Sequence, residues 1–347
     1  MRVLAAMSGG VDSSVAAALL LEAGHDVVGV TMRLWGGESD TGCCSVSEVD
    51  DARRVAHRLG IDHHVFNFAE EFEEHVVAPY VADHVAGRTP NPCVECNRRL
   101  KFDKLYRRAD ALGFDAVATG HHARVVADDD GTLRIGRGAD AAKDQSYVLY
   151  PLGAAELART LLPVGDLTKA RVRDLAAALD LPTATKPDSQ DVCFITRSDG
   201  RRAFLERRIE LHPARVVDES GAEVGRADAV ELVTIGQRRG LDLAGGAARR
   251  FAIDVDVAAA TVTVGPPERL RRDHVDLTTM VWALAPVDGP VLVQCSAHGE
   301  PHPASVRPSG DGATATVHWD SPRPRVAPGQ SVVLYERDEV VGGGIAI

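Results

Sequence analysis

The sequence contains no apolar run long enough to span a membrane, and its first residues read as a core strand rather than as a signal peptide. We therefore expect a cytoplasmic protein with no membrane partner. Basic charge is also scarce, because 50 Asp and Glu residues outnumber 39 Lys and Arg residues and give a net charge of −11. This balance argues against a protein that coats nucleic acid by bulk charge, although a local basic patch can still bind RNA.

Cysteine is sparse as well. The 347 residues contain six: Cys43, Cys44, Cys93, Cys96, Cys193 and Cys295. In a cytoplasmic chain of this size they do not predict a disulfide framework. Catalysis or metal binding is the better expectation for any cysteines that cluster.

The first 120 residues alternate strands and helices. Strands are expected at 2–7, 26–34, 63–68 and 115–119, and helices at 13–23, 46–59 and 98–112. This order predicts a parallel sheet with helices on both faces and a ligand site beyond the carboxyl ends of the strands. A hairpin is expected over 123–138 and a helical stretch over 153–179.

After about residue 200 the pattern changes to short alternating strands with frequent Gly and Pro. Such runs include 260–264, 291–295, 313–319 and 331–335. The pattern predicts a small β-rich domain followed by a β-barrel.

The most informative motif is Ser-Gly-Gly-Val-Asp-Ser-Ser at residues 8–14, directly after the apolar run Val3–Met7. Glycines let the backbone approach a ligand closely, and the start of the next helix offers unpaired N–H groups to an anion. The Gly-Lys-Ser/Thr ending of a Walker A loop is missing. The string resembles the loop of enzymes that split ATP between its α and β phosphates. An ordinary strand-to-helix connection is the alternative.

Cys96 follows the stiff segment Thr89–Cys93, which contains two prolines, and precedes the basic helix expected from Arg98. A thiol near a helix N-terminus and close to arginines ionises more easily than a free cysteine, whose pKa is about 8.5. This describes a nucleophile. The Cys93-x-x-Cys96 spacing also fits half of a zinc site, but the chain has no second such pair. Cys193 follows a polar, turn-like segment and is the other candidate for a reactive thiol. The alternative interpretation is that Cys193 is buried and inert.

Two groups of basic residues are candidate RNA contacts, with a solvated helix face as the alternative for each. The first comprises Arg98, Arg99, Lys101, Lys104, Arg107 and Arg108, and the second Arg197, Arg201, Arg202, Arg207 and Arg208.

Several strings occur in an order that carries a resemblance. They are Ser8–Ser14, Asn91–Asn97, Thr119–His122, Lys143–Tyr147, Asp188–Phe194, Ile235–Leu241 and Pro328–Ser331. Over nearly its whole length the chain resembles the bacterial tRNA-specific 2-thiouridylases of the PP-loop ATP pyrophosphatase superfamily. One departure is Cys295–His298, which stands where relatives often have Arg-Tyr-Arg, so tRNA contact there is less expected.

The resemblance implies an α/β fold in three parts. Residues 1–200 would form a PP-loop catalytic domain with a parallel sheet, of the adenine nucleotide alpha hydrolase type. Residues 201–275 would form a small central β-rich domain, and 276–347 a C-terminal β-barrel that contacts tRNA. The implied reaction is 2-thiolation of the wobble uridine. ATP adenylates the uracil O2, sulfur from a cysteine persulfide attacks C2, and AMP and pyrophosphate are released.

The resemblance also implies site residues. The ATP-binding positions are Ala6, Met7, Ser8, Gly9, Gly10, Val11, Asp12, Ser13, Met32 and Gly120, and Asp12 would help hold Mg²⁺ on the departing pyrophosphate. The positions near the target base or on tRNA are Asn91, Pro92, Cys93, His121, Lys143, Asp144, Gln145 and Gln330.

Cys193 matches the cysteine of the family that carries the persulfide, and Cys96 matches its partner. Cys96 would either release sulfide from the persulfide or resolve the disulfide left after direct attack, and both routes join Cys96 and Cys193 transiently. Some relatives carry aspartate in place of Cys93. This chain has three sulfurs, on Cys93, Cys96 and Cys193, that could converge and hold a [4Fe–4S] cluster, which is a minority hypothesis.

The implied partners are tRNAs for Lys, Glu and Gln, with a cysteine desulfurase or a sulfur-relay protein as donor. Two rival functions remain open. One is an ATP pyrophosphatase acting on another, small substrate, which would not need the basic helix or the β-rich tail. The other is a non-catalytic nucleotide- or flavin-binding module, which would not need two reactive thiols.

Overall fold

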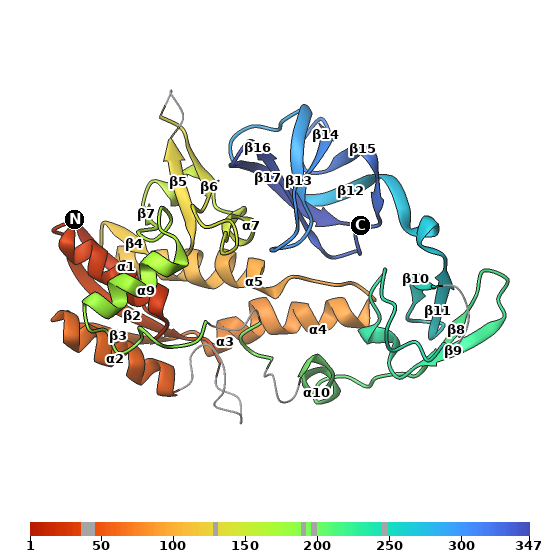
Figure 1. The fold of residues 1–347 in the computed structure, drawn as a ribbon, viewed down its shortest axis with the longest axis horizontal. Coiled ribbons are helices and arrows are strands. Elements are labelled where there is room, and N and C mark those ends of the chain that lie inside the picture. The colour runs from red at the N-terminus through yellow and green to blue at the C-terminus, as the bar shows by residue number, and fades with distance from the viewer. Residues whose placement is uncertain (36–45, 128–130, 189–191, 196–199, 244–248) are drawn as a thin grey trace.

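The computed structural model describes residues 1–35, 46–127, 131–188, 192–195, 200–243 and 249–347. They form three sheets: a five-stranded parallel sheet, a four-stranded sheet and a sheet that closes into a barrel. The N-terminal α/β domain lies at one end of an elongated body and the four-stranded sheet at the other, with the barrel between and above them (Figure 1). The predicted fold class is confirmed.

The parallel sheet has the strand order β3-β2-β1-β4-β7. Its strands are β1 (Arg2–Ala6), β2 (Asp26–Arg33), β3 (His63–Asn67), β4 (Ala116–Ala118) and β7 (Thr160–Leu161). Side chains alternate between two cores, because successive residues of a strand point to opposite faces. Val3 and Ala5 pack with helices α1 (Val11–Glu22), α2 (Val46–Leu59) and α9 (Lys169–Ala178), whereas Leu4 packs on the other face.

That second face is covered by a helical region rich in aromatic side chains. It comprises α3 (Ala69–Phe72), the π-helix η1 (Glu73–Val77), α4 (Ala78–Val85), α5 (Pro92–Glu95), the π-helix η2 (Cys96–Lys104) and α6 (Leu105–Ala111). Their buried side chains form the largest apolar cluster of the described residues together with Leu4, Val30 and Val117.

The predicted helical stretch 153–179 is wrong in its middle. The structure has α8 (Ala154–Leu157), then the short strand β7, and only then α9. Pro163 and Gly165 disfavour a continuous helix here, and Thr160 pairs with Val117 at the edge of the sheet. The two-residue strand is too short to leave a periodic signal.

The basic helix begins earlier than predicted. Asn91 accepts a hydrogen bond from the Cys93 N–H through its side chain at 3.1 Å, and Pro92 occupies the first helical position. Both choices favour a helix start. Cys93 therefore lies at the helix N-terminus, whereas Cys96 lies inside the helix and is 6% exposed.

The four-stranded sheet follows α10 (Gly200–Glu206). It has the order β10-β11-β8-β9, formed by β8 (Ala214–Val217), β9 (Glu223–Ala227), β10 (Phe251–Asp256) and β11 (Thr261–Gly265). Two 3₁₀ turns flank these strands, η3 (Val230–Leu232) and η4 (Pro267–Leu270). The buried carboxylate of Glu231 accepts a hydrogen bond from the His212 ring at 2.8 Å, which ties η3 to the segment before β8.

Six antiparallel strands form the barrel in the order β12-β15-β14-β13-β16-β17, and a β12–β17 pairing closes it. They are β12 (Arg271–Trp282), β13 (Gly289–Gln294), β14 (His302–Pro308), β15 (Ala315–Pro324), β16 (Ser331–Glu336) and β17 (Glu339–Ala346). The predicted strand runs near 291, 313 and 331 fall in β13, β15 and β16.

The barrel is joined to the N-terminal domain by backbone. β17 also pairs with β6 (Leu133–Arg137) of the hairpin that β6 forms with β5 (Ala123–Ala127). The hydroxyl of Tyr147 in α7 (Ser146–Leu149) donates to the carbonyl of Ser331 at 2.7 Å. The Thr89 N–H donates to the carbonyl of Pro328 at 2.7 Å, next to the cysteine-bearing helix. None of the helices in the described parts of the chain combines the length and the apolar character that crossing a membrane requires.

Candidate functional site

The loop at residues 8–10 lies where the strand order reverses. The chain moves from β1 to β2 on one side, while β4 pairs with β1 on the other side. The carboxyl ends of β1 and β4 therefore flank a crevice, which is the usual ligand position in open parallel sheets. Ser8–Ser14 follows β1, and Thr119–His122 follows β4, so the structure brings these two predicted strings together.

Two glycines make the loop fit its surroundings. A Cβ on Gly120 would lie 2.5 Å from the backbone nitrogen of Ser13, and a Cβ on Gly9 would lie 2.3 Å from the carbonyl oxygen of Glu48. Gly9 also has a φ of +73°. Only glycine allows both close approaches.

The first turn of α1 is suited to an anion. Gly10 is its N-cap residue and has no side chain that could cap the first N–H groups. The Ser13 hydroxyl accepts from the Ser8 N–H at 3.2 Å and donates to the Gly10 carbonyl at 3.0 Å. The loop is thereby held open around the positive end of the helix, where phosphate groups bind. These residues fit ATP.

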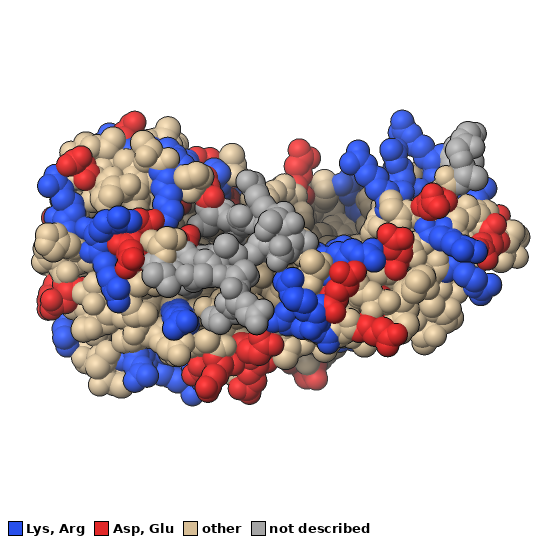
Figure 2. All heavy atoms as spheres, turned by 90° about the horizontal axis from the view of Figure 1, so that it is seen from below, with Lys and Arg blue, Asp and Glu red and all other residues tan. Residues whose placement is uncertain are grey.

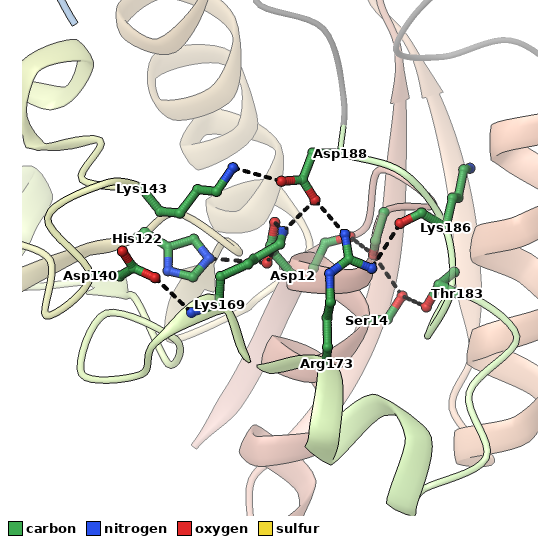
Figure 3. Close-up of polar contacts among 12 residues, drawn as sticks. Asp12, Ser14, His122, Asp140, Lys143, Lys169, Arg173, Thr183, Lys186 and Asp188 are labelled. Atoms are coloured by element: carbon green, nitrogen blue, oxygen red, sulfur yellow. Dashed lines mark hydrogen bonds and ion pairs between the residues drawn. The ribbon is translucent and has the colours of Figure 1, made fainter. Parts of the chain in front are cut away.

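Asp12 is the acidic residue of this turn. Its carboxylate accepts hydrogen bonds from Lys169 Nζ at 2.7 and 2.8 Å and lies 3.0 Å from His122 Nε2 (Figure 3). Burial raises the pKa of Asp12, but the hydrogen bonds from His122 and Lys169 outweigh it, so the pKa lies below its ordinary value. Asp12 is therefore ionised at neutral pH. One carboxylate with substrate phosphates is a common set of ligands for Mg²⁺.

Asp188 joins three cationic side chains beside this loop. Lys143 Nζ lies 2.8 Å from its carboxylate, Lys169 Nζ 2.9 Å and Arg173 Nη2 2.8 Å (Figure 3). Burial raises the pKa of Asp188, but the hydrogen bonds from Lys143 and Lys169 outweigh it and hold the pKa well below its ordinary value. We call Lys143, Lys169 and Arg173 the cation cluster.

Three of the cations beside the loop were missed by sequence reasoning: Lys169, Arg173 and Lys186. Lys186 Nζ donates to the Gly9 carbonyl at 2.9 Å and to Asp51 at 2.7 Å. The sequence did contain one signal, because Lys169 and Arg173 are four residues apart on a helix and therefore share a face. Their partner Asp12 is distant in sequence, so only the fold identifies the contact.

The predicted thiols lie around one aromatic cluster. Cys96 is part of the large apolar core, and Cys193 packs against the same core. The ring of Phe194, next to Cys193, lies 5.4 Å from Tyr80 and 5.6 Å from Phe72. Burial raises the pKa of Tyr80 to about 12, and the nearby Cys93 contributes to the rise. The structure holds Cys93, Cys96 and Cys193 as thiols, and the transient Cys96–Cys193 disulfide stays a prediction.

A metal cluster does not fit these cysteines as placed. Among the residues that the structure describes, no group of three or more His, Cys, Asp or Glu side chains is arranged to hold a metal ion. Cys43 and Cys44 lie outside the described residues. Cys295, which follows β13, is partly buried against the barrel core, and burial raises the pKa of its thiol to about 12, so it stays protonated and unreactive.

The predicted tRNA contacts fall into two groups. Some are committed to contacts within the protein. Asp144 is 8% exposed and accepts from Arg137 at 2.9 Å and from Ser146. The Gln145 side chain accepts the His122 N–H at 2.9 Å. His121 is buried against Phe102, and burial holds its pKa well below the ordinary value.

The others lie along the cysteine-bearing helix, the Gln330 turn and the cation cluster, where Asn91, Gln330 and Lys143 are partly exposed and Pro92 is buried. Asn91 and Pro92 start the cysteine-bearing helix, and Gln330 follows Pro328, whose carbonyl contacts Thr89. Lys143 is partly exposed at the edge of the cation cluster. Contact of all these residues with tRNA stays a prediction.

Three members of the first basic group line a groove of about 410 Å³. Its lining includes Arg98, Arg99, Arg107 and Arg159, with Asp103 and Glu156 among them. In the second group, Arg201 donates to the Leu232 carbonyl and Arg208 covers the Phe204 ring, so these two hold the fold, and Arg197 lies outside the described residues. On the face seen from below, basic side chains alternate with acidic ones and gather at the end with the four-stranded sheet (Figure 2).

Family comparisons cover almost the whole chain. Residues 1–197 match the tRNA methyl transferase HUP domain, 202–266 the tRNA methyl transferase PRC-barrel domain, and 272–346 the aminomethyltransferase beta-barrel domain. A solved structure, the U34-tRNA thiolase NcsA from Methanococcus maripaludis with its [4Fe-4S] cluster, is 21% identical over 56% of this chain and 62% of its own, with a TM-score of 0.38. That likeness is too distant to bear on function.

Curated relatives are much closer. The tRNA-specific 2-thiouridylase MnmA of Roseiflexus sp. (strain RS-1) is 46% identical over 99% of this chain and 98% of its own length. The protein of the same name from Chloroflexus aggregans is 47% identical over 99% of this chain and 97% of its own. With the PP-loop and both cysteine strings in place along a full-length match, the chain belongs to the tRNA-specific 2-thiouridylase (MnmA) family.

Proposed function

We propose that this protein catalyses the ATP-dependent 2-thiolation of the wobble uridine in tRNA. The observation that carries the proposal is the match at 46–47% identity, end to end, with proteins named tRNA-specific 2-thiouridylases. The geometry supports it, because a phosphate-binding loop and two cysteine-bearing segments belong to one domain.

The first step activates an oxygen that leaves poorly. The uracil O2 attacks the α phosphorus of ATP, the bond to the β phosphate oxygen breaks, and pyrophosphate departs. The N–H groups at the start of α1 and the ammonium group of Lys169 face negative charge that grows on the leaving group. Asp12 would hold Mg²⁺, which supplies charge neutralisation to the phosphates.

The second step replaces oxygen by sulfur. The terminal sulfur of a persulfide on Cys193 attacks C2, and AMP leaves with the former O2. In this route Cys96 then attacks the Cys193 sulfur of the disulfide that links Cys193 to C2, and the thiolated uridine is released. In the alternative route Cys96 attacks the persulfide first, and the hydrosulfide that it releases attacks C2. Both routes leave a Cys96–Cys193 disulfide, which a thiol must reduce. Cys96 and Cys193 pack on one apolar core, which supports their meeting after a local rearrangement.

The proposal extends to partners and place. The tRNAs would be those for Lys, Glu and Gln, the sulfur would come from a cysteine desulfurase or a relay protein, and the reaction would occur in the cytoplasm. The arginine-lined groove beside the cysteine-bearing helix suits a phosphate backbone, since arginine pairs well with phosphate.

One experiment tests the function directly. Purified protein is incubated with ATP, Mg²⁺, a persulfide donor and unmodified tRNA, and the digested tRNA is analysed by mass spectrometry for 2-thiouridine. Pyrophosphate release is measured in parallel with and without tRNA. We expect thiolation at the wobble position and release that depends on tRNA. Release indifferent to tRNA, with no thiolated nucleoside, would contradict the proposal.

A further inference from the structure

The Asp188 carboxylate makes the contacts that a bound anion would make at this place. Its two oxygens accept hydrogen bonds from all three members of the cation cluster within 2.9 Å. Carboxylate–cation bonds at such distances are among the stronger polar contacts in proteins. Asp188 is nevertheless about one-third exposed, so its carboxylate can leave for water without crossing the core.

The cation cluster is continuous with the phosphate-binding loop. Lys169 donates to Asp188 and, at the same time, to Asp12 in the first turn of α1. The two carboxylates therefore share one ammonium group, which is only 12% exposed. Three cations lie beside two carboxylates here. Without Asp188 the positive charges would outnumber the remaining carboxylate, and this excess of positive charge would favour binding of a multiply charged anion.

We propose that Asp188 competes with the pyrophosphate part of ATP for Lys143, Lys169 and Arg173, as an internal anion that ATP must displace. The inference rests on the proposed function for the identity of the anion. The pKa of Asp188, held below its ordinary value, keeps it charged at neutral pH.

The cluster stays in place when Asp188 leaves. Arg173 Nη1 also donates to the carbonyls of Ala184 and Lys186 at 3.1 and 3.0 Å, and these bonds do not involve the Asp188 side chain. Lys169 keeps Asp12 as a partner. Two of the three cations are therefore preorganised for phosphate.

The exchange has a consequence for the second half of the reaction. Asp188 lies five residues before Cys193 in the sequence. Its bonds to Lys143, Lys169 and Arg173 therefore fix a point that is close to this cysteine in sequence. Displacement by pyrophosphate would release Asp188 while the nucleotide is bound, which would couple ATP binding to Cys193.

The test uses the full-length protein and inorganic pyrophosphate, titrated by calorimetry in EDTA so that no divalent metal takes part. Asp188→Asn keeps the shape and removes the charge. If Asp188 occupies the cluster about nine-tenths of the time, its removal tightens pyrophosphate binding about tenfold. Asp188→Glu keeps the charge and should bind pyrophosphate as the wild type does.

Two further variants separate local competition from general charge. Asp166→Asn removes a carboxylate that is 81% exposed and pairs with Arg124, outside the cluster, and should leave the affinity unchanged. The double variant Asp188→Asn, Lys143→Met should lose most of the tenfold gain. An unchanged or weakened affinity in Asp188→Asn would overturn the inference, and so would an equal gain in Asp166→Asn.

A measurement on the wild type covers the case in which Asp188→Asn does not fold. Exposed carboxylates are coupled to glycine ethyl ester with a carbodiimide and the products are located by mass spectrometry. Pyrophosphate should raise the labelling of Asp188 relative to Asp166 in the same sample. A constant or falling ratio would refute displacement.

These outcomes are distinguishable from failure of the proposed function. Neither binding nor labelling requires tRNA or a sulfur donor. A protein that thiolates tRNA but shows no competition refutes only the inference. A protein that shows competition but no thiolation refutes only the function.

Discussion

Both carboxylate oxygens of Asp12 accept hydrogen bonds from the Lys169 ammonium group, at 2.8 and 2.7 Å, across 157 residues of sequence. This pair joins the phosphate-binding loop to the start of α9. It holds a cation beside the first turn of α1, where the proposed function places the phosphates of ATP.

Replacing Lys169 should slow the activation step. In Lys169→Met the leaving phosphates lose a charged donor worth about 1.5–3 kcal/mol, so kcat/KM for pyrophosphate release should fall at least about tenfold. The rate is measured with saturating tRNA. Arg171→Met, an exposed change on the same helix, is the control. Equal rates in Lys169→Met and the control would contradict this role.

Gly120 is expected to be essential for the shape of the loop. Gly120→Ala puts a Cβ 2.5 Å from the backbone of Ser13, which must shift, at a cost of about 1–3 kcal/mol. We expect a lower melting temperature and a higher KM for ATP. Gly310→Ala adds a Cβ in open space and is the matched control. A normal KM in Gly120→Ala would show that the close approach is not needed.

The two-cysteine mechanism makes a separate prediction. Cys96→Ser and Cys193→Ser should each abolish thiolation with a persulfide donor, while the Kd for tRNA stays within about twofold because no phosphate contact is lost. Cys295→Ala should retain thiolation, since burial raises the pKa of that thiol to about 12. Filter binding and nucleoside mass spectrometry give both readouts. Thiolation by either serine variant would refute the mechanism.

Much of the architecture follows from local signals. The alternation of apolar strands and amphipathic helices in the first 120 residues identifies the parallel sheet, because each period matches one kind of element. The predicted start of the cysteine-bearing helix is wrong, because a stiff segment with two prolines usually lies outside a helix. Asn91 followed by Pro92 is in fact a helix-start signature.

The candidate site could be predicted only where its residues are adjacent in sequence. The loop at 8–14 is contiguous and its chemistry is readable. The cation cluster and its partner Asp188 are not, because Lys143, Lys169 and Asp188 come from separate segments that meet only in the folded chain. Long-range pairing of charges leaves no periodic pattern in a single sequence.

A buried histidine should make stability depend on pH. Burial lowers the pKa of His84 to about 4 from its ordinary value of 6.5. As the pH falls below 6.5, the unfolded chain binds a proton that the folded chain refuses, so stability decreases by up to about 1.4 kcal/mol per pH unit until the pH nears 4.

His84→Gln removes this contribution. The gap in melting temperature between the wild type and His84→Gln should therefore narrow as the pH falls from 7 to 5. His57→Gln, on the exposed face of α2, is the control. Calorimetry at several pH values gives the melting temperatures, and a gap independent of pH would contradict the assignment.

The arginine groove predicts a salt effect. Arg98→Gln removes one candidate phosphate contact, so tRNA binding should weaken and the slope of log K against log salt should fall by about 1. Arg53→Gln, paired with Asp50 on α2, is the charge-matched control. If both variants change the slope equally, the groove is not the site of contact.

The pairing of β17 with β6 gives the molecule a fixed reach. Because Glu339 pairs with Gly136, and the Arg137 backbone N–H donates to the Asp338 carbonyl at 2.8 Å, the barrel cannot move away from the N-terminal domain without breaking backbone bonds. For an RNA that binds the barrel, the distance from the barrel to the crevice at the ends of β1 and β4 would then be fixed. One added base pair in its stem would then bring a different nucleotide to the catalytic crevice.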